Sequence, residues 1–343
     1  MLIKEIVKNI LRSPYKKLFW ALGSSRLSDF VFPGHKSQFL ILMYHRVLPS
    51  SQITNNYIDL TMGLEKFEAQ IRLISQRYLP ISIEDLSIDD REGNKNIHLP
   101  VVITFDDGYR DNLVYALPIL KRYNVPATIY VTTSYPDGNG TVWWYEVCDI
   151  IKDNEYLNFR YREKKYEFRL NNDLDRKNAY IELVKLFFYM TPSAQTELLS
   201  IIRDADKRPK SRCYRNLFLS WDEIKILAQE PLITIGAHTH RHYNLSMLDY
   251  DLLKEEILLS MHRLEEEIGI EIKHFAYPFG GDGFVTDREY EIVKKLEFRT
   301  AVTTYQHSQN EIVDPYQLPR YGMGSFFDEI NLKKGLDPFF WKH

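Results

Sequence analysis

Residues 101–108 read VVITFDDG, and this stretch decides the fold. Its first five residues are apolar or β-branched, which is the pattern of a strand buried on both faces. Two adjacent carboxylates, Asp106 and Asp107, follow where the strand ends, and Gly108 permits a turn. Taken alone, this tripeptide is ordinary turn chemistry. In an α/β barrel, however, the carboxyl end of a strand is also where catalytic side chains lie.

Strands and helices alternate on both sides of this stretch. Residues 39–44 form another apolar run, and a helix is predicted at 63–78. The same order continues after Gly108, with further strands at 127–132, 232–236, 274–277 and 299–303 and helices at 110–123, 221–229, 249–268 and 286–296. Repeated units of this kind predict an α/β fold with a mainly parallel sheet.

This alternation is interrupted between residues 134 and 218. Two short alternating stretches, 156–161 and 165–170, predict a β-hairpin. Two helical patterns follow, at 174–189 and 194–205, and Pro192 with Ser193 marks the start of the second. We therefore expect an inserted α+β subdomain on the loop side of a barrel, where insertions commonly shape substrate access.

Composition excludes several classes of protein. The chain of 343 residues is 44% hydrophobic and 27% charged, as expected of a globular protein with a sizeable core. A net charge of -3 gives no reason to expect nucleic acid as a partner. Two cysteines, Cys148 and Cys213, exclude a disulfide framework and a structural zinc cluster.

Residues 1–35 form a separate N-terminal segment. Apolar residues recur at helical spacing between lysines and arginines, and residues 16–20 read KKLFW. This pattern predicts a basic amphipathic helix, which either lies on a membrane surface or docks on the protein itself. Neither a signal peptide nor a stretch of transmembrane length is visible. We therefore expect a cytoplasmic protein, with this helix as its candidate peripheral contact to the inner membrane surface.

A second polar cluster follows the strand predicted at 232–236. Three histidines, His238, His240 and His242, occur within five residues. Neutral imidazole is a preferred zinc ligand, and two histidines with one carboxylate leave positions open for water and substrate, as a catalytic metal site requires. The two clusters together therefore predict a catalytic metal site.

The same clusters resemble the polysaccharide deacetylase family, also called the NodB-homology family or carbohydrate esterase family 4. Its first motif, Thr-Phe-Asp-Asp-Gly, matches residues 104–108, and its second, His-Ser/Thr-x-x-His, matches residues 238–242. The resemblance implies a distorted (β/α)7-type barrel over residues 36–343, interrupted by the insertion at 134–218. His240 falls at a variable position of the second motif and is left out of the metal site.

The resemblance also implies roles for individual residues. Asp106 corresponds to the general base of the family. Asp107, His238 and His242 correspond to the ligands of a divalent metal, usually zinc. The backbone N–H of Tyr109 corresponds to the group that stabilises the oxyanion of the tetrahedral intermediate.

Two further family motifs are incomplete in this chain. The third motif reads Arg-x-Pro-Phe/Tyr, and the matching residues 276–279 read AYPF, without the arginine. The C-terminal Leu-x-His motif, which normally brings the acid histidine, is replaced by Leu-Pro-Arg at 318–320. We expect Arg320 to supply the missing cation and to hold Asp106 ionised by charge pairing.

The acid histidine has a candidate near the other end of the chain. Residues 43–47 read MYHRV and close the first predicted strand. They resemble the branch of the family that processes poly-N-acetylglucosamine and related surface glycans, in which the acid comes from the N-terminal side. This resemblance makes His45 the general acid.

Aromatic residues near the strand ends are candidate substrate contacts. Trp143 and Trp144 follow the third strand, where they either stack on sugar rings or form the seam between insertion and barrel. Tyr277, Pro278 and Phe279 of the third motif complete this set of candidate substrate-binding residues.

The function implied by the resemblance is metal-dependent removal of an N-acetyl group from an amino sugar of a glycan or glycan precursor, in surface polysaccharide biosynthesis or modification. One alternative is an O-acetyl esterase or another amidohydrolase on the same scaffold. A second is an inactive glycan-binding protein at the membrane surface. The complete set of metal ligands argues against the second alternative.

Overall fold

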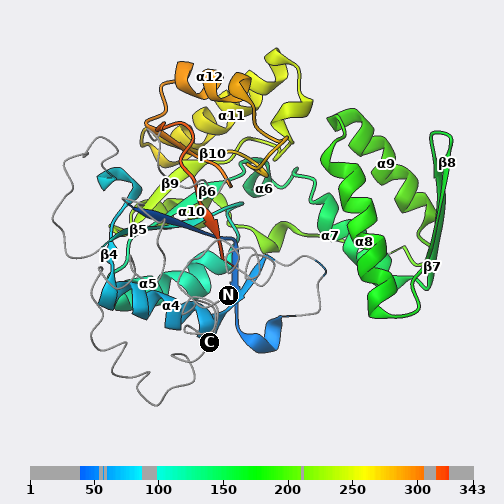
Figure 1. Ribbon diagram of the computed structural model, residues 1–343, viewed down its shortest axis with the longest axis horizontal. Coiled ribbons are helices and arrows are strands. Elements are labelled where there is room, and N and C mark those ends of the chain that lie inside the picture. Colours follow the sequence, from blue (N-terminus) through cyan, green and yellow to red (C-terminus); the bar gives the residue numbers. More distant parts are fainter. Residues whose placement is uncertain are drawn as a thin grey trace, which may run out of the picture.

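The computed structural model describes residues 39–53, 57, 60–86, 99–209, 212–304 and 314–323. The amphipathic helix predicted at residues 1–35 lies outside these ranges. Figure 1 shows a larger part, in which helices surround a curled sheet, and a smaller lobe formed by residues 143–205.

A curled parallel sheet forms the centre of the larger part. Among the described residues, seven of its strands follow one another in the order β11-β10-β9-β6-β5-β1-β12, and β4 pairs with β5 outside this path. This arrangement confirms the predicted α/β class and the (β/α)7-type barrel. The bounds are β1 Leu40–Tyr44, β4 Leu79–Pro80, β5 Pro100–Phe105, β6 Ala127–Val131, β9 Ile233–Ala237, β10 His274–Ala276, β11 Thr300–Val302 and β12 Tyr321–Gly322.

Residues 314–323 join the two edges of this sheet. β12 pairs with β1 on one side, and Leu318 forms a bridge with Val302 of β11 on the other. The peptide N–H of Leu318 donates to Ala301 O at 3.0 Å, within the same connection. Arg320 stands between these two pairings. It therefore lies in the seam that closes the barrel.

Alternate residues of each strand face two different cores. In β5, Val101, Ile103 and Phe105 pack with the surrounding helices, whereas Val102 packs with residues of the other strands inside the barrel. Successive side chains of a strand point to opposite faces. Continuing this alternation one residue past the strand directs Asp106 into the barrel interior.

Helices cover the outside of the sheet. α11 begins after Asp249, whose side chain accepts from Leu252 N, and it ends before Gly269, which has φ +71°. None of the helices in the described part of the chain has the length and apolar composition needed to span a bilayer. The bounds are α4 Leu64–Arg77, α5 Leu117–Tyr123, α6 Ser134–Asp137, α10 Trp221–Ala228, α11 Tyr250–Ile268 and α12 Asp287–Lys295. A small separate sheet pairs β2 Arg46–Leu48 with β3 Thr61–Gly63.

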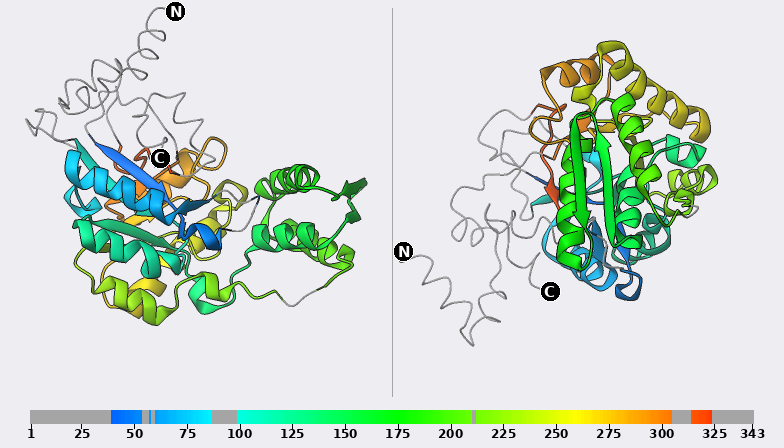
Figure 2. Two further views of the ribbon diagram at one scale, coloured as in Figure 1. Left: turned by 90° about the horizontal axis from the view of Figure 1, so that it is seen from below. Right: turned by 90° about the vertical axis from the view of Figure 1, so that its right-hand side faces the viewer.

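The smaller lobe projects to one side of the barrel (Figure 2). It contains the hairpin and the two helices predicted from the sequence, preceded by one further helix. Its buried apolar residues form a core separate from that of the barrel helices. The elements are α7 Trp143–Asp153, β7 Tyr156–Tyr161, β8 Lys164–Arg169, α8 Asp173–Phe188 and α9 Pro192–Ala205.

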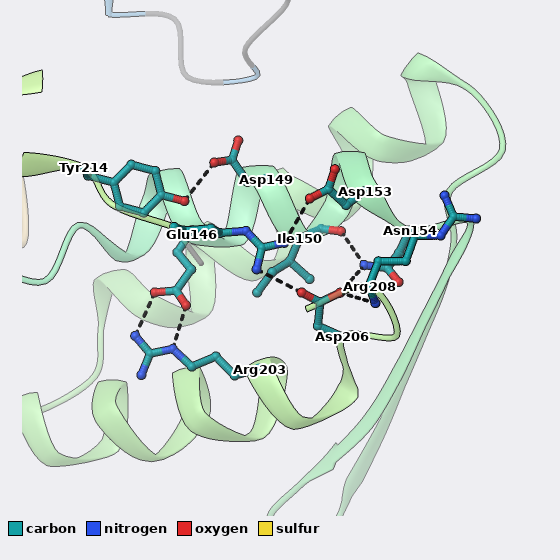
Figure 3. Close-up of polar contacts among 10 residues, drawn as sticks. Glu146, Asp149, Ile150, Asp153, Asn154, Arg203, Asp206, Arg208 and Tyr214 are labelled. Atoms are coloured by element: carbon teal, nitrogen blue, oxygen red, sulfur yellow. Dashed lines mark hydrogen bonds and ion pairs between the residues drawn. The ribbon is translucent and has the colours of Figure 1, made fainter. Parts of the chain in front are cut away.

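A polar network attaches α9 and the chain after it to α7 (Figure 3). Arg203 donates to both carboxylate oxygens of Glu146, at 2.6 and 2.7 Å. Arg212 binds Asp206 at 2.9 Å and Asp153 at 3.0 Å. Because bidentate and charge-assisted bonds fix orientation, this network holds the returning chain against the lobe.

Because the lobe has its own core, replacing a leucine of α8 by alanine should affect stability differently at a buried and at an exposed position. Leu183 is 0% exposed and Leu174 is 66% exposed. We expect Leu183→Ala to lower the free energy of unfolding by about 2–5 kcal/mol, because it opens a cavity in a packed core. Leu174→Ala, the matched control, should change it by less than about 0.5 kcal/mol. Urea denaturation followed by tryptophan fluorescence measures both, and equal effects would contradict the assignment of this core.

Candidate metal centre and catalytic site

The candidate site lies at the carboxyl ends of neighbouring strands. Asp106 follows β5, His45 follows β1, and residues 238–242 follow β9. The N–H of Asp106 donates to Tyr44 O at 3.0 Å, and the N–H of His238 donates to Val131 O at 3.0 Å. Continued pairing beyond the strand ends therefore brings the two predicted clusters to one edge of the sheet.

Asp107, His238 and His242 form the candidate metal centre. Each offers one ligand atom, all three residues are buried, and the three atoms lie within 4.8 Å of one another. Asp107 Oδ1 is 3.4 Å from His238 Nε2 and 3.2 Å from His242 Nε2. This oxygen is buried and makes no hydrogen bond of good geometry. Converging buried donors around an unsatisfied carboxylate oxygen fit a divalent metal ion.

The surroundings prepare two of these groups for metal binding. The Nδ1 of His238 lies 2.7 Å from Ala276 O, which is a hydrogen bond when Nδ1 carries the proton and which leaves Nε2 free as a ligand. Burial alone raises the pKa of Asp107, but His242 and His238, as protonated rings before a metal binds, hold it well below the ordinary carboxyl value. Asp107 is therefore ionised, as a metal ligand must be.

The ligand loops contain unusual backbone conformations. Asp107, Thr239, His242 and Phe279 have φ of +73°, +61°, +57° and +62°. For residues with side chains, this left-handed region costs on the order of 1–3 kcal/mol each. The hydroxyl of Thr239 accepts a hydrogen bond from His242 N at 3.0 Å. This bond helps to hold the loop in the conformation that turns both histidines toward Asp107.

Glu256 of α11 supports the same loop from outside. Its carboxylate accepts from Arg241 N at 2.7 Å and from the Arg241 guanidinium at 2.6 Å. Its carbonyl accepts from His240 N at 3.1 Å, and His240 Nδ1 lies 2.8 Å from Thr133 Oγ1. His240 therefore has partners of its own and does not belong to the group of converging ligand atoms.

Arg320 reaches Asp106 across the interior of the barrel. Its two terminal nitrogens donate to the two carboxylate oxygens, each at 2.7 Å. The guanidinium also donates to Thr303 O at 3.0 Å and to Thr104 Oγ1 at 3.2 Å. Arg320 is 0% exposed and Asp106 is 2% exposed. The structure thus contains the contact on which the expected orienting role of Arg320 depends.

This ion pair sets the charge state of Asp106. Burial by itself raises the pKa of Asp106, but Arg320, together with His238 and His45, holds the pKa below the ordinary carboxyl value. The two bonds from Arg320 use two of the approximately four acceptor positions of a carboxylate. Asp106 therefore remains ionised and keeps capacity to accept a proton.

His45 and Tyr109 lie beside these groups. Burial lowers the pKa of His45, while the nearby carboxylates Asp107 and Asp106 act in the opposite direction. A lowered pKa makes the protonated ring a stronger proton donor but reduces the fraction of rings that carry the proton at neutral pH. Tyr109 pairs with Phe218 in an isolated β-bridge. The two hydrogen bonds of this bridge, at 2.8 and 2.9 Å, join the peptide groups next to these residues, so the bridge does not use the Tyr109 N–H.

The structure corrects the expectation for Trp143. This residue is 5% exposed, and its ring stacks on Phe187 at 4.5 Å with an interplanar angle of 8°. It is a core residue of the lobe, because the stack with a second helix covers one face of the indole. Trp144, also buried, lies 5.3 Å from the His242 ring and contributes to the seam between lobe and site.

The third motif requires a similar correction. Tyr277 is 0% exposed, packs against Phe275 and Tyr290, and donates to Tyr316 O at 3.1 Å. Strand alternation directs it toward the helices instead of the site. Pro278 is buried as well. The residue of this motif at the site is Phe279, whose ring lies 4.9 Å from His242.

Two residues near the site were not identified from the sequence. Asp111 and Asn112 contact the chain that follows β1, including His45 O. The available signal was an adjacent acidic and amide pair close behind the Asp-Asp-Gly turn. The sequence pattern does not show that this pair contacts the chain after β1, because the contact depends on how β1 and β5 pair.

Sequence comparison identifies related proteins. A family model described as polysaccharide deacetylase matches residues 94–301. YxkH of Bacillus subtilis (strain 168), which is named for the same family, is 33% identical over 92 residues. That alignment covers 26% of this chain and 30% of the relative, so the chain spans less than a third of that relative's length.

Three solved structures share the fold. The Streptococcus pyogenes deacetylase PplD, in complex with acetate, is 18% identical with a TM-score of 0.54, and the match covers 88% of this chain and 98% of that one. The BpsB deacetylase domain of Bordetella bronchiseptica gives 18% and 0.50, covering 83% and 95%. A de-N-acetylase from Aggregatibacter actinomycetemcomitans gives 18% and 0.50, covering 82% and 93%. At this identity, the likeness establishes the fold.

The Arg320–Asp106 pair predicts a large effect on stability. Arg320→Met leaves Asp106 buried without its partner, so we expect the free energy of unfolding to fall by about 3–5 kcal/mol at neutral pH. Arg122→Met, which breaks an exposed pair with Glu68, should cost at most about 1 kcal/mol. Guanidinium denaturation measures both variants.

The same pair predicts a pH dependence. A carboxyl whose pKa is lower in the folded state contributes stability above its unfolded pKa and loses it as the pH falls through the folded pKa. This contribution to acid destabilisation should be absent from Arg320→Met. Parallel pH profiles for the two proteins would contradict the assignment.

The Thr239 hydroxyl predicts an effect on metal affinity. Thr239→Val keeps the shape of the side chain but removes the acceptor for His242 N, so we expect zinc to bind about 10- to 100-fold more weakly. Thr234→Val, in the strand before the loop, is the matched control. Chelator competition on the stripped protein measures zinc affinity directly. Wild-type affinity in Thr239→Val would show that this hydroxyl does not position the ligands.

Proposed function

Because this chain belongs to the polysaccharide deacetylase family, we propose that it hydrolyses the N-acetyl group of an amino sugar in a glycan or glycan precursor. The observation that carries the proposal is the buried Arg320–Asp106 pair next to the converging Asp107, His238 and His242. An ionised, oriented carboxylate beside a candidate metal centre suits the hydrolysis of an acetyl group.

We propose zinc as the metal, held by Asp107, His238 and His242. Two imidazoles with one carboxylate are a common ligand set of catalytic zinc, and they leave coordination positions open. When bound, a divalent metal at this position lowers the pKa of a water molecule and polarises the acetyl carbonyl. The proton transfers are the work of the protein's own side chains.

Asp106 and His45 act as base and acid in the proposed reaction. Asp106, kept ionised by Arg320, accepts the proton of the attacking water. The backbone N–H of Tyr109 donates to the oxyanion of the tetrahedral intermediate. His45 gives a proton to the departing nitrogen, so that the C–N bond breaks into acetate and a free amine.

The position of His45 supports a narrower proposal on the substrate. An acid that follows the first strand is the feature by which the chain resembles the branch acting on poly-N-acetylglucosamine and related surface glycans. We therefore propose a role in surface polysaccharide biosynthesis or modification. We also propose that the protein acts in the cytoplasm, at the inner membrane surface through the helix predicted at residues 1–35.

Acetate release tests this function. The zinc-loaded protein should release acetate from an N-acetylglucosamine oligomer. Asp106→Asn and His45→Ala should each reduce the rate by about 10²- to 10⁴-fold, because each removes a proton-transfer group. His262→Ala, at an exposed histidine of α11, is the control for His45→Ala and should keep wild-type activity.

A parallel assay on O-acetylated glycans separates the main alternative. Release from these esters alone would identify an O-acetyl esterase. Wild-type rates in Asp106→Asn on the N-acetylated oligomer would reject this residue as the base.

A further inference from the structure

Asp111 and Asn112 hold the backbone around the proposed acid. Asn112 Nδ2 donates to His45 O at 2.8 Å. Asp111 accepts from Val47 N at 2.9 Å through one oxygen and from Arg46 Nε at 2.8 Å through the other. Asp111 and Asn112 together therefore bind three consecutive residues after β1. Asp111 is 5% exposed and Asn112 is 1% exposed.

The loop that carries this pair also carries the proposed base. Asp106 N donates to Tyr44 O, one residue before His45. The chain after β1 is thus attached to residues 106–112 both immediately before and immediately after the acid. The loop then enters a π-helical turn at Asn112–Ala116, a conformation that is frequent at functional sites.

Arg46 extends this arrangement to neighbouring aromatic residues. It donates to Tyr145 OH of α7 at 3.2 Å, and its guanidinium lies 5.2 Å from the centre of the Tyr109 ring. A buried ion pair contributes little net stability relative to apolar residues of the same size. Its presence beside the acid is therefore better explained by the geometry it fixes.

We propose that Asp111 and Asn112 are positioning residues that set where His45 stands relative to Asp106. They touch no reacting atom and act through the backbone of residues 45–47. This inference rests on the proposed function, because it takes His45 as the acid of the deacetylation.

The leaving group distinguishes this role from general structural support. An amide nitrogen needs a proton before the C–N bond breaks, whereas nitrophenolate leaves without one. A displaced His45 therefore slows amide hydrolysis far more than hydrolysis of an activated aryl ester. Damage to the fold or to the metal centre slows both.

Two substitutions test the proposal on zinc-loaded full-length protein. Asp111→Asn and Asn112→Leu are measured on an N-acetylglucosamine oligomer and on 4-nitrophenyl acetate. We expect acetate release from the oligomer to fall about 10- to 100-fold, with aryl ester hydrolysis and zinc content within about twofold of wild type. If Asp111→Asn does not fold, Asn112→Leu carries the test, because it removes only an amide.

Asp206→Asn is the matched control, and Figure 3 shows Asp206 with its partners. Asp206 is also a buried carboxylate, bound by Arg212 at 2.9 Å and by an asparagine, Asn154, at 2.7 Å. Like Asp111, which binds Arg46 and accepts from Asn112 Nδ2 at 3.3 Å, it pairs with one arginine and one asparagine, but it lies in the smaller lobe. This variant should leave the ratio of oligomer to ester rates unchanged.

A double variant tests whether Asp111 acts through His45. In a His45→Gln background, Asp111→Asn should change the oligomer rate by no more than about twofold, since the acid is already lost. Independent, multiplying effects would overturn the proposal, as would equal losses on both substrates in Asp111→Asn and Asn112→Leu. A wild-type protein without activity on any N-acetylated glycan would overturn the proposed function and this inference together. If the wild type is active and both variants have its ratio of oligomer to ester rates, this inference alone would be overturned.

Discussion

The buried ion pair of Arg320 and Asp106 connects the closure of the barrel with its candidate chemistry. Arg320 stands in the segment that joins β12 to β1 and Leu318 to β11. Its guanidinium has no access to water, so its charge must be matched by a carboxylate inside the barrel. The contact that completes the fold is thus also the contact that keeps Asp106 ionised. A protein without this contact would lose both the closure of the barrel and the ionised state of Asp106.

Elsewhere in the site, buried hydrogen bonds also stabilise backbone conformations that are unfavourable on their own. The left-handed conformations of Asp107, Thr239 and His242 are unfavourable in isolation, and the histidine loop is fixed by backbone N–H groups that donate to Thr239 and Glu256. Residues 106–112 attach in turn to the chain after β1. Asp106, His45 and the candidate metal ligands therefore stand on neighbouring parts of one sheet edge, as the proposed acid–base chemistry requires.

Sequence alone predicted the parts of this arrangement that depend on local patterns. The strands before Asp106 and His238 are visible because apolar runs end in polar clusters, and the resemblance to a known family placed those clusters in one site. Features that depend on the direction of a side chain could not be predicted from these patterns. Tyr277 faces the helices because of strand alternation, and Trp143 is covered by Phe187 from a distant helix. The contacts of Asp111 with the chain after β1 depend on sheet pairing, which no local pattern records.

The central claim is that the converging Asp107, His238 and His242 hold a metal without which Asp106 cannot act. Stripping the full-length protein with a chelator and titrating zinc back, with acetate release from an N-acetylglucosamine oligomer recorded at each step, tests it most directly. We predict no turnover in the stripped protein and a linear recovery that ends at about one zinc ion per chain. Full activity of the stripped protein, or recovery unrelated to zinc occupancy, would contradict the account.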